Sequence, residues 1–161
     1  MKHLITLLVE NKPGVLARIV GLISGRGYNI ESLNVAPSQD GAVSRMTMTV
    51  PGDDHVLEQV TKQLNKLIDV IKVTDLTKKR YQSRELALVE VAAAADRRAE
   101  LAELAGVFEA KVVAVQERSL TLQIVADQER IADFLAVLKP FRIMDISRTG
   151  VVAVPRGDAK D

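Results

Sequence analysis

The order of its apolar segments is the feature that most constrains the fold of this chain. Short runs rich in branched residues, typical of strands, alternate with segments whose apolar residues recur at helical spacing. In the first half, the order is strand, helix, strand, strand, helix, strand. The expected segments are Leu4–Val9, Val15–Ser24, Asn29–Ala36, Arg45–Val50, a helix that starts at Asp53 or Asp54 and reaches Leu67, and Val70–Leu76. Together they fit one small domain of about 75 residues.

The second half repeats this order with different residues. Its expected segments are Glu85–Val91, a helix capped by Asp96, a hairpin of Val112–Val115 and Leu120–Val125, a helix capped by Asp127, and Phe141–Ser147. The order βαββαβ is that of the split βαβ, ferredoxin-like sandwich. We therefore predict an α+β fold with two ferredoxin-like sandwiches in tandem. Val151–Asp161 is expected to be a frayed polar end.

A polar, basic stretch separates the two halves at Lys78–Ser83. We place one domain at residues 1–77 and the other at residues 84–161, with residues 78–83 as a linker. A binding patch is the alternative interpretation of this charge run, although a run this short is usually solvated.

The strand patterns predict how much of the first sheet is covered. Leu4–Val9 is apolar on both faces, which indicates a strand buried on both sides. Arg45–Val50 instead alternates, with Met46 and Met48 on one face and Thr47 and Thr49 on the other. That alternation predicts a sheet with one covered face.

Composition excludes several classes of function. The formal net charge of +1, from 22 basic and 21 acidic side chains, gives no general electrostatic attraction to nucleic acid or to an anionic membrane. Aromatic residues make up 3%, too few for base-stacking platforms. Without cysteine the chain has no disulfide and no thiolate. No segment resembles a signal peptide or a membrane span, so we expect a cytoplasmic protein.

The residues needed for catalysis are scarce. His3 and His55 are the only histidines, and we expect both to be partly exposed structural residues. Asp53 and Asp54 could bind a cation, but an acidic pair at a helix start is usually a cap. No phosphate-binding, dinucleotide-binding or zinc-protease motif is present. We therefore predict that the chain is not an enzyme and holds no metal or cofactor.

The turn from Asn11 to Gly14 is the strongest candidate for a binding site. Pro13 is expected at the first helical position, where its missing N–H costs nothing. Gly14 would let a ligand approach the backbone, and free N–H groups with the helix dipole favour a carboxylate there. The equivalent place in the second half is Ala92–Ala95, so we expect one site, in the first half only. The alternative is a plain strand-to-helix turn.

A free amino acid would fit the groups around this turn. Gly14 and Val15 could donate N–H groups to its carboxylate, and the amides of Asn11 and Asn29 could both donate and accept hydrogen bonds. Ile30 and Leu33 could form an apolar wall for the side chain.

Four stretches resemble one known family. Asn11–Leu16 has the pattern N-x-P-G-V-L, and Gly27–Leu33 and Ser44–Thr47 extend the match, as does the ending Ser147–Asp158. In these stretches the chain is similar to the small regulatory subunit of acetohydroxyacid synthase (acetolactate synthase), whose first domain is an ACT domain. The similarity covers essentially the whole chain.

This resemblance implies a non-catalytic partner of a thiamine-diphosphate enzyme of branched-chain amino-acid synthesis. The small subunit of that family activates the large catalytic subunit and confers feedback inhibition, usually by valine. Paired ACT domains of a homodimer bind the effector at their interface. Thiamine diphosphate, magnesium and any FAD would belong to the catalytic subunit, and no nucleic acid or membrane partner is implied.

The same resemblance assigns effector-site residues. The matching positions are Asn11, Gly14, Asn29, Ile30 and Ala36, and Gln59 matches a position in the second helix linked to the feedback response. Which branched-chain amino acid binds is left open, because valine, leucine and isoleucine differ by only a few methyl groups.

Two other functions remain as alternatives at this stage. A free-standing ACT-type amino-acid sensor could control another enzyme or a transcription factor. A small ferredoxin-like enzyme would need a base near a nucleophile, which the sequence lacks.

Overall fold

The computed structural model describes residues 1–157, which form two compact units. The first unit contains one four-stranded sheet in the order β2-β3-β1-β4, and each neighbouring pair is antiparallel. This is the predicted ferredoxin-like arrangement. Its elements are β1 (Lys2–Glu10), α1 (Val15–Gly25), β2 (Ser32–Pro37), β3 (Val43–Pro51), α2 (Asp54–Asn65) and β4 (Val70–Asp75).

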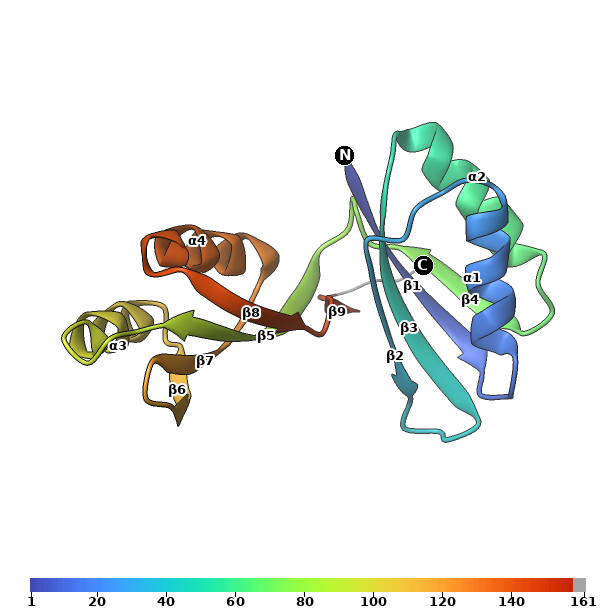
Figure 1. The fold of residues 1–161 in the computed structure, drawn as a ribbon. Helices are drawn as coiled ribbons and strands as arrows, with labels where there is room; N and C mark the ends of the chain where they lie inside the picture. Colours follow the sequence, from blue (N-terminus) through green and yellow to red (C-terminus); the bar gives the residue numbers. More distant parts are fainter. Residues whose placement is uncertain (158–161) are drawn as a thin grey trace. The chain divides into compact units, whose positions relative to one another are not determined.

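Both helices of the first unit lie on one face of its sheet (Figure 1). Ile5 and Leu7 of β1 alternate toward this face and meet Met46 and Met48 of β3, to which they are paired in register. Ile19 of α1 covers them, and all five side chains are almost fully buried. The apolar residues at strand spacing in β1 and β3 and those at helical spacing in α1 therefore pack together in one core.

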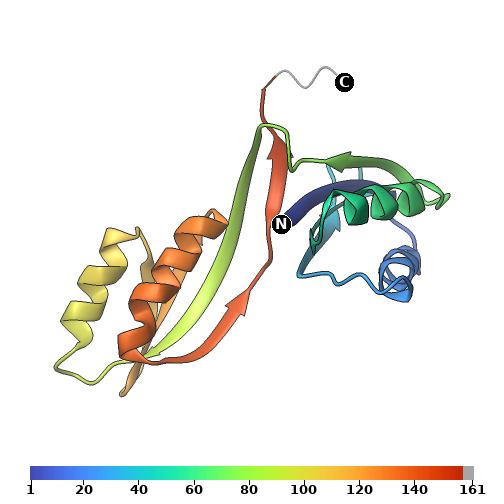
Figure 2. The ribbon, with the colours of Figure 1, turned by 90° about the horizontal axis from the view of Figure 1, so that it is seen from above.

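The second unit repeats the topology. Four of its strands follow the order β6-β7-β5-β8, which corresponds position by position to the order of the first sheet. Its helices lie on one face of the sheet, as Figure 2 shows, and enclose a core around Phe134. The elements are β5 (Tyr81–Ala92), α3 (Arg98–Val107), β6 (Lys111–Val115), β7 (Ser119–Ala126), α4 (Gln128–Leu138), a short 3-10 turn (Lys139–Phe141) and β8 (Ile143–Arg148). The predicted α+β tandem is confirmed.

The predicted helix caps are correct for the second helix of each unit. Asp53 accepts a hydrogen bond from Val56 N at 2.9 Å, and Asp127 accepts one from Arg130 N at 2.9 Å. The cap predicted at Asp96 is wrong, because α3 begins only at Arg98 and has no side-chain cap. Asp96 instead lies in a turn closed by Arg97 N and Ala94 O, a setting that aspartate also favours.

The predicted frayed end is wrong for the residues up to Pro155. Val152–Pro155 form a strand, β9, that pairs with β5 (Figure 2). Val151 and Ala153 are buried with Leu4 and Leu76 in a small apolar cluster. The alternation of Val151 and Ala153 with exposed neighbours is a strand pattern that the position near the chain end concealed. Residues 158–161 lie outside the described part.

The two compact units are divided differently from the predicted domains. The first unit comprises Met1–Gln82 together with the chain from Gly150 onward, and the second comprises Ser83–Thr149. The predicted linker is also shorter than expected, because Tyr81–Ser83 already belong to β5. The chain thus leaves the first unit and returns to it.

The first sheet is covered on more than the helix face. Burial of β1 on both faces is confirmed. The single covered face predicted for β3 is wrong, because Thr47 and Thr49, which point away from the helices, are each only 3% exposed. Gly150 lies against β2 and Val151 packs on Leu4, so the returning segment covers part of this second face.

Candidate functional site

The turn between β1 and α1 differs from its predicted form at Pro13. The helix begins at Val15, with Gly14 as its N-cap residue, so Pro13 precedes the helix instead of opening it. Gly14 has a φ of 85°, in the left-handed region that glycine enters without strain. The two residues together produce a sharp exit from β1 that leaves the first turn of α1 exposed.

Several N–H groups of this turn are open. Val15 N donates to Lys12 O at 3.4 Å, and Arg18 N donates to Gly14 O at 3.0 Å. The N–H groups of Gly14, Leu16 and Ala17 have no hydrogen-bond partner among residues 1–157. Of the two predicted donors, Gly14 therefore has an open N–H, whereas that of Val15 is engaged and its side chain is a core residue. Unpaired donors at the positive end of a helix favour an anion.

Asn11 ties the turn to the β2–β3 loop. Its Nδ2 donates to Gly41 O at 2.9 Å, and its backbone N donates to Ala42 O at 2.9 Å. Its Oδ1 has no hydrogen-bond partner within the described chain. Asn11 thus has a structural role and keeps one acceptor open beside the helix start.

Arg18 is a neighbour of the turn that the sequence reasoning missed. Its Nε and Nη2 donate to Asp69 Oδ2 at 2.9 and 2.6 Å, which fixes the guanidinium. A Cβ built on Gly14 would lie 3.1 Å from Arg18 Nη1. The spacing of four residues on a helix was the available signal, since it places the Arg18 side chain back over Gly14. Glu10, 2.9 Å from Lys12 Nζ, raises the pKa of that amine by hydrogen bonding.

The remaining predicted site residues lie before and along β2. Asn29 and Ile30 precede the strand, which begins at Ser32 and not at Asn29 as expected. Asn29 is exposed, while Ile30 and Leu33 are half-buried against the core of the unit. Leu33 pairs with Met48 and Ala36 with Arg45, so the two side chains point to opposite faces of the sheet.

One copy of the unit does not bring these groups together. Ala36 lies near the end of β2 where Pro37 pairs with Ser44, at the same end of the sheet as Glu10 and the turn. Asn29 and Ile30 lie at the other end, beyond Ser32 and its partner Thr49. Helix α1, 11 residues long, runs between these ends and spans about 16 Å.

Gln59 lies on neither of these segments. It is half-buried in the middle of α2, a helix that packs against α1 and β4. Any influence on the turn would therefore pass through the contact of α2 with α1.

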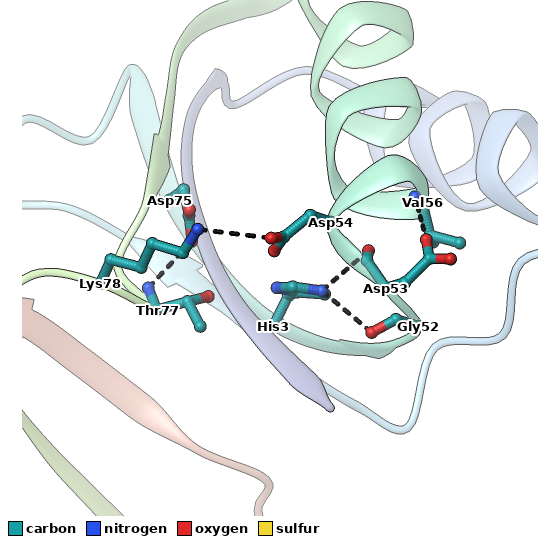
Figure 3. Close-up of polar contacts among 8 residues, drawn as sticks. All are labelled: His3, Gly52, Asp53, Asp54, Val56, Asp75, Thr77 and Lys78. Carbon is teal, nitrogen blue, oxygen red and sulfur yellow. Dashed lines mark hydrogen bonds and ion pairs between the residues drawn. The ribbon is translucent and has the colours of Figure 1, made fainter.

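His3 and the acidic pair Asp53 and Asp54 have structural roles (Figure 3). His3 is fully buried, contrary to the partial exposure expected, and its Nε2 lies 3.0 Å from both Gly52 O and Asp53 O. Asp54 forms an ion pair with Lys78 at 3.5 Å, and His55 is exposed. Within residues 1–157, no three His, Asp or Glu side chains are grouped to hold a metal ion, and no helix is long and apolar enough to cross a membrane.

Comparison with known families matches both halves of the chain. Residues 5–72 match the AHAS small subunit-like ACT domain, and residues 84–157 match the small subunit of acetolactate synthase. The chain belongs to the acetolactate synthase small-subunit family. The first domain is thus an ACT domain, as the resemblance implied, and the family places the chain in branched-chain amino-acid synthesis.

Individual members of the small-subunit family are similar over the whole length. A probable acetolactate synthase small subunit of Archaeoglobus fulgidus is 46% identical over 160 residues, covering 99% of this chain and 100% of its own. The acetolactate synthase small subunit of Mycolicibacterium smegmatis is 47% identical, covering 96% of this chain and 91% of its own. A crystal structure of the small subunit from Thermotoga maritima, 34% identical, superposes with a TM-score of 0.87 over 99% of both chains.

Proposed function

We propose that this chain is the non-catalytic regulatory subunit of acetolactate synthase, activating the catalytic subunit and inhibiting it when valine is bound. The observation that carries the proposal is the difference between the two units. Among residues 1–157, the first helix of the first unit follows a left-handed Gly14 and lies beside the Asn11 amide, whereas the first helix of the second unit follows Arg97 in a helical conformation. The first unit is also the one that matches the ACT domain. Thiamine diphosphate, magnesium and any FAD would then be held by the catalytic subunit.

The turn offers complementary groups for a zwitterion. The N–H groups of Gly14, Leu16 and Ala17 would bind the carboxylate, with the Arg18 guanidinium beside them. Asn11 Oδ1 would accept a hydrogen bond from the ammonium group. A branched aliphatic side chain then needs an apolar wall, which the turn itself does not provide.

A second copy of the chain would supply that wall. β2 is an edge strand, hydrogen-bonded only to β3 within its sheet. Antiparallel pairing of β2 with its copy about a two-fold axis would bring Asn29 and Ile30 of the partner subunit to the end that carries Ala36 and the turn. Such a dimer would also cover Leu16 and Val35, which are 42% and 40% exposed. Two identical valine sites would result.

Inhibition then follows from differential binding. Valine that contacts both subunits favours the arrangement in which the two halves of the site meet, and it can inhibit only if that arrangement activates less. A coupling of about 1–3 kcal/mol suffices for a 5- to 150-fold effect. Gln59, on the helix that packs against α1, would modulate this balance.

Reconstitution with a cognate catalytic subunit tests the proposal. We expect the chain to raise acetolactate synthase activity and to make it sensitive to valine in a titration from micromolar to millimolar concentrations. Leucine and isoleucine, assayed in parallel, would identify the effector. Absence of both activation and a complex with the catalytic subunit, with valine still bound in calorimetry, would instead support a free-standing sensor.

A further inference from the structure

Gly150 lies where the chain returns from the second unit to the first. It is buried and has a φ of 79°. A Cβ built on Gly150 would lie 3.3 Å from Ser32 Cβ, 3.5 Å from Leu33 N and 3.6 Å from Leu33 O. Its backbone is therefore in close contact with the start of β2, and both the left-handed conformation and the lack of space favour glycine.

The segment that follows is fixed to the first unit. Val151 and Ala153 are buried against Leu4 and Leu76, and Arg156 N donates to Arg80 O at 2.9 Å. On the other side, Thr149 N donates to Leu86 O at 3.0 Å, and Thr149 Oγ1 accepts from Leu86 N at 3.1 Å. Thr149 and Leu86 belong to the second unit. A single peptide bond therefore joins a residue anchored in the second unit to one seated on β2.

The strand beneath Gly150 is the one that carries the proposed effector wall. β2 contains Leu33 and Ala36 and directly follows Asn29 and Ile30. Within the described chain it is held laterally by β3 alone, with an added hydrogen bond between Ser32 Oγ and Thr49 Oγ1 at 2.7 Å. Besides this pairing and the packing of Leu33 on the core, β2 is contacted by Gly150 at Ser32 and Leu33.

We propose that Gly150 is a positioning residue that holds the start of β2 in place within the first unit, so that inhibition by the effector depends on this contact while activation does not. The proposal rests on the function proposed above. The contact acts on the strand that carries Leu33 and Ala36 and that directly follows Asn29 and Ile30.

Gly150→Ala and Gly157→Ala form a matched pair to test this contact. Both glycines have a φ near 78°, but a Cβ on Gly157 meets no atom of residues 1–157 within 4 Å. Both substitutions place a side chain at a left-handed φ, and only Gly150→Ala presses on Ser32 and Leu33. Each full-length variant is assayed with the catalytic subunit across a valine titration, and hydrogen exchange of the amides of β2 and β7 is measured on the free chain.

For Gly150→Ala we expect faster exchange in β2 with β7 unchanged, activation within twofold of wild type, and at least a tenfold higher valine concentration for half-inhibition. Gly157→Ala should match wild type in all four readouts. Unchanged exchange in β2, or faster exchange with normal inhibition, would overturn the proposed role of Gly150. If wild type itself does not respond to valine, the proposed function fails, and exchange in β2 then decides alone whether Gly150 positions the strand.

Discussion

The two units share a topology and differ in the turn that precedes their first helix. Both have the same strand order, and the second helix of each is capped by an aspartate, Asp53 or Asp127. The first helices start differently. Helix α1 follows a turn with Gly14 at a φ of 85°, whereas α3 follows Arg97 in an ordinary helical conformation. The fold therefore does not require the turn from Asn11 to Gly14, and a functional explanation for it is favoured.

The largest expected effects come from breaking each core separately. Leu64 in the first unit and Leu122 in the second are both fully buried. Leu64→Ala and Leu122→Ala should each lower the free energy of unfolding by about 2–5 kcal/mol, because each leaves a cavity. Chemical denaturation, with hydrogen exchange resolved by peptide, assigns the loss to one unit.

Adding valine tests which of the two cores is stabilised by the ligand. At about 100 times its dissociation constant, a ligand stabilises the state that binds it by about 2.7 kcal/mol. We expect valine to offset much of the loss in Leu64→Ala and to leave exchange in the core of the second unit of Leu122→Ala unchanged. Equal protection of both cores would contradict a site confined to the first unit.

Substitution of Gly14 tests the turn between β1 and α1, which distinguishes the first unit from the second. Gly14→Asp should place a carboxylate on the donors meant for the ligand and weaken valine binding at least tenfold, or about 1.4 kcal/mol. Activation should remain. Calorimetry measures the binding, and reconstituted activity measures the activation.

Gly14→Asn is the matched control for that substitution. Asparagine and aspartate tolerate a left-handed backbone to a similar degree and have nearly the same shape, so only the charge differs. We expect Gly14→Asn to bind valine more tightly than Gly14→Asp. An equal loss in both variants would assign the effect to the shape of the turn instead of to an anion site.

Most of the topology followed from the sequence because apolar periodicity records which face of each element is buried. Leu4–Val9 was predictable for this reason. The caps at Asp53 and Asp127 were predictable because aspartate directly precedes a helical apolar pattern, although the same signal at Asp96 was misleading. The returning segment was not, since the burial of Val151 and Ala153 depends on Leu4 and Leu76, which lie far away in sequence. For the site, the residue types at the turn were informative, whereas their separation from Asn29 depends on strand register and became visible only in the folded sheet.

A smaller effect is expected from removing the cap of α4. Asp127→Ala should cost about 1 kcal/mol, because Arg130 N loses its acceptor. Asp127→Ser keeps an oxygen in reach and should recover most of this loss. Thermal unfolding of the full chain measures both, and equal destabilisation by the two substitutions would rule out capping as the cause.

The smallest expected effect is a pH dependence at the equivalent cap in the first unit. The hydrogen bond from Val56 N lowers the pKa of Asp53 from its usual value of 3.8. Because the folded pKa lies below the unfolded one, this carboxylate contributes stability above pH 3.8 and loses it as the pH falls through the folded pKa. Asp53 is exposed, so solvent screening keeps the contribution small. Asp53→Asn can still cap but cannot titrate, and its unfolding midpoint should therefore fall less steeply than that of wild type over this acidic range. Parallel curves for the two proteins would show that the cap does not depend on the charge of Asp53.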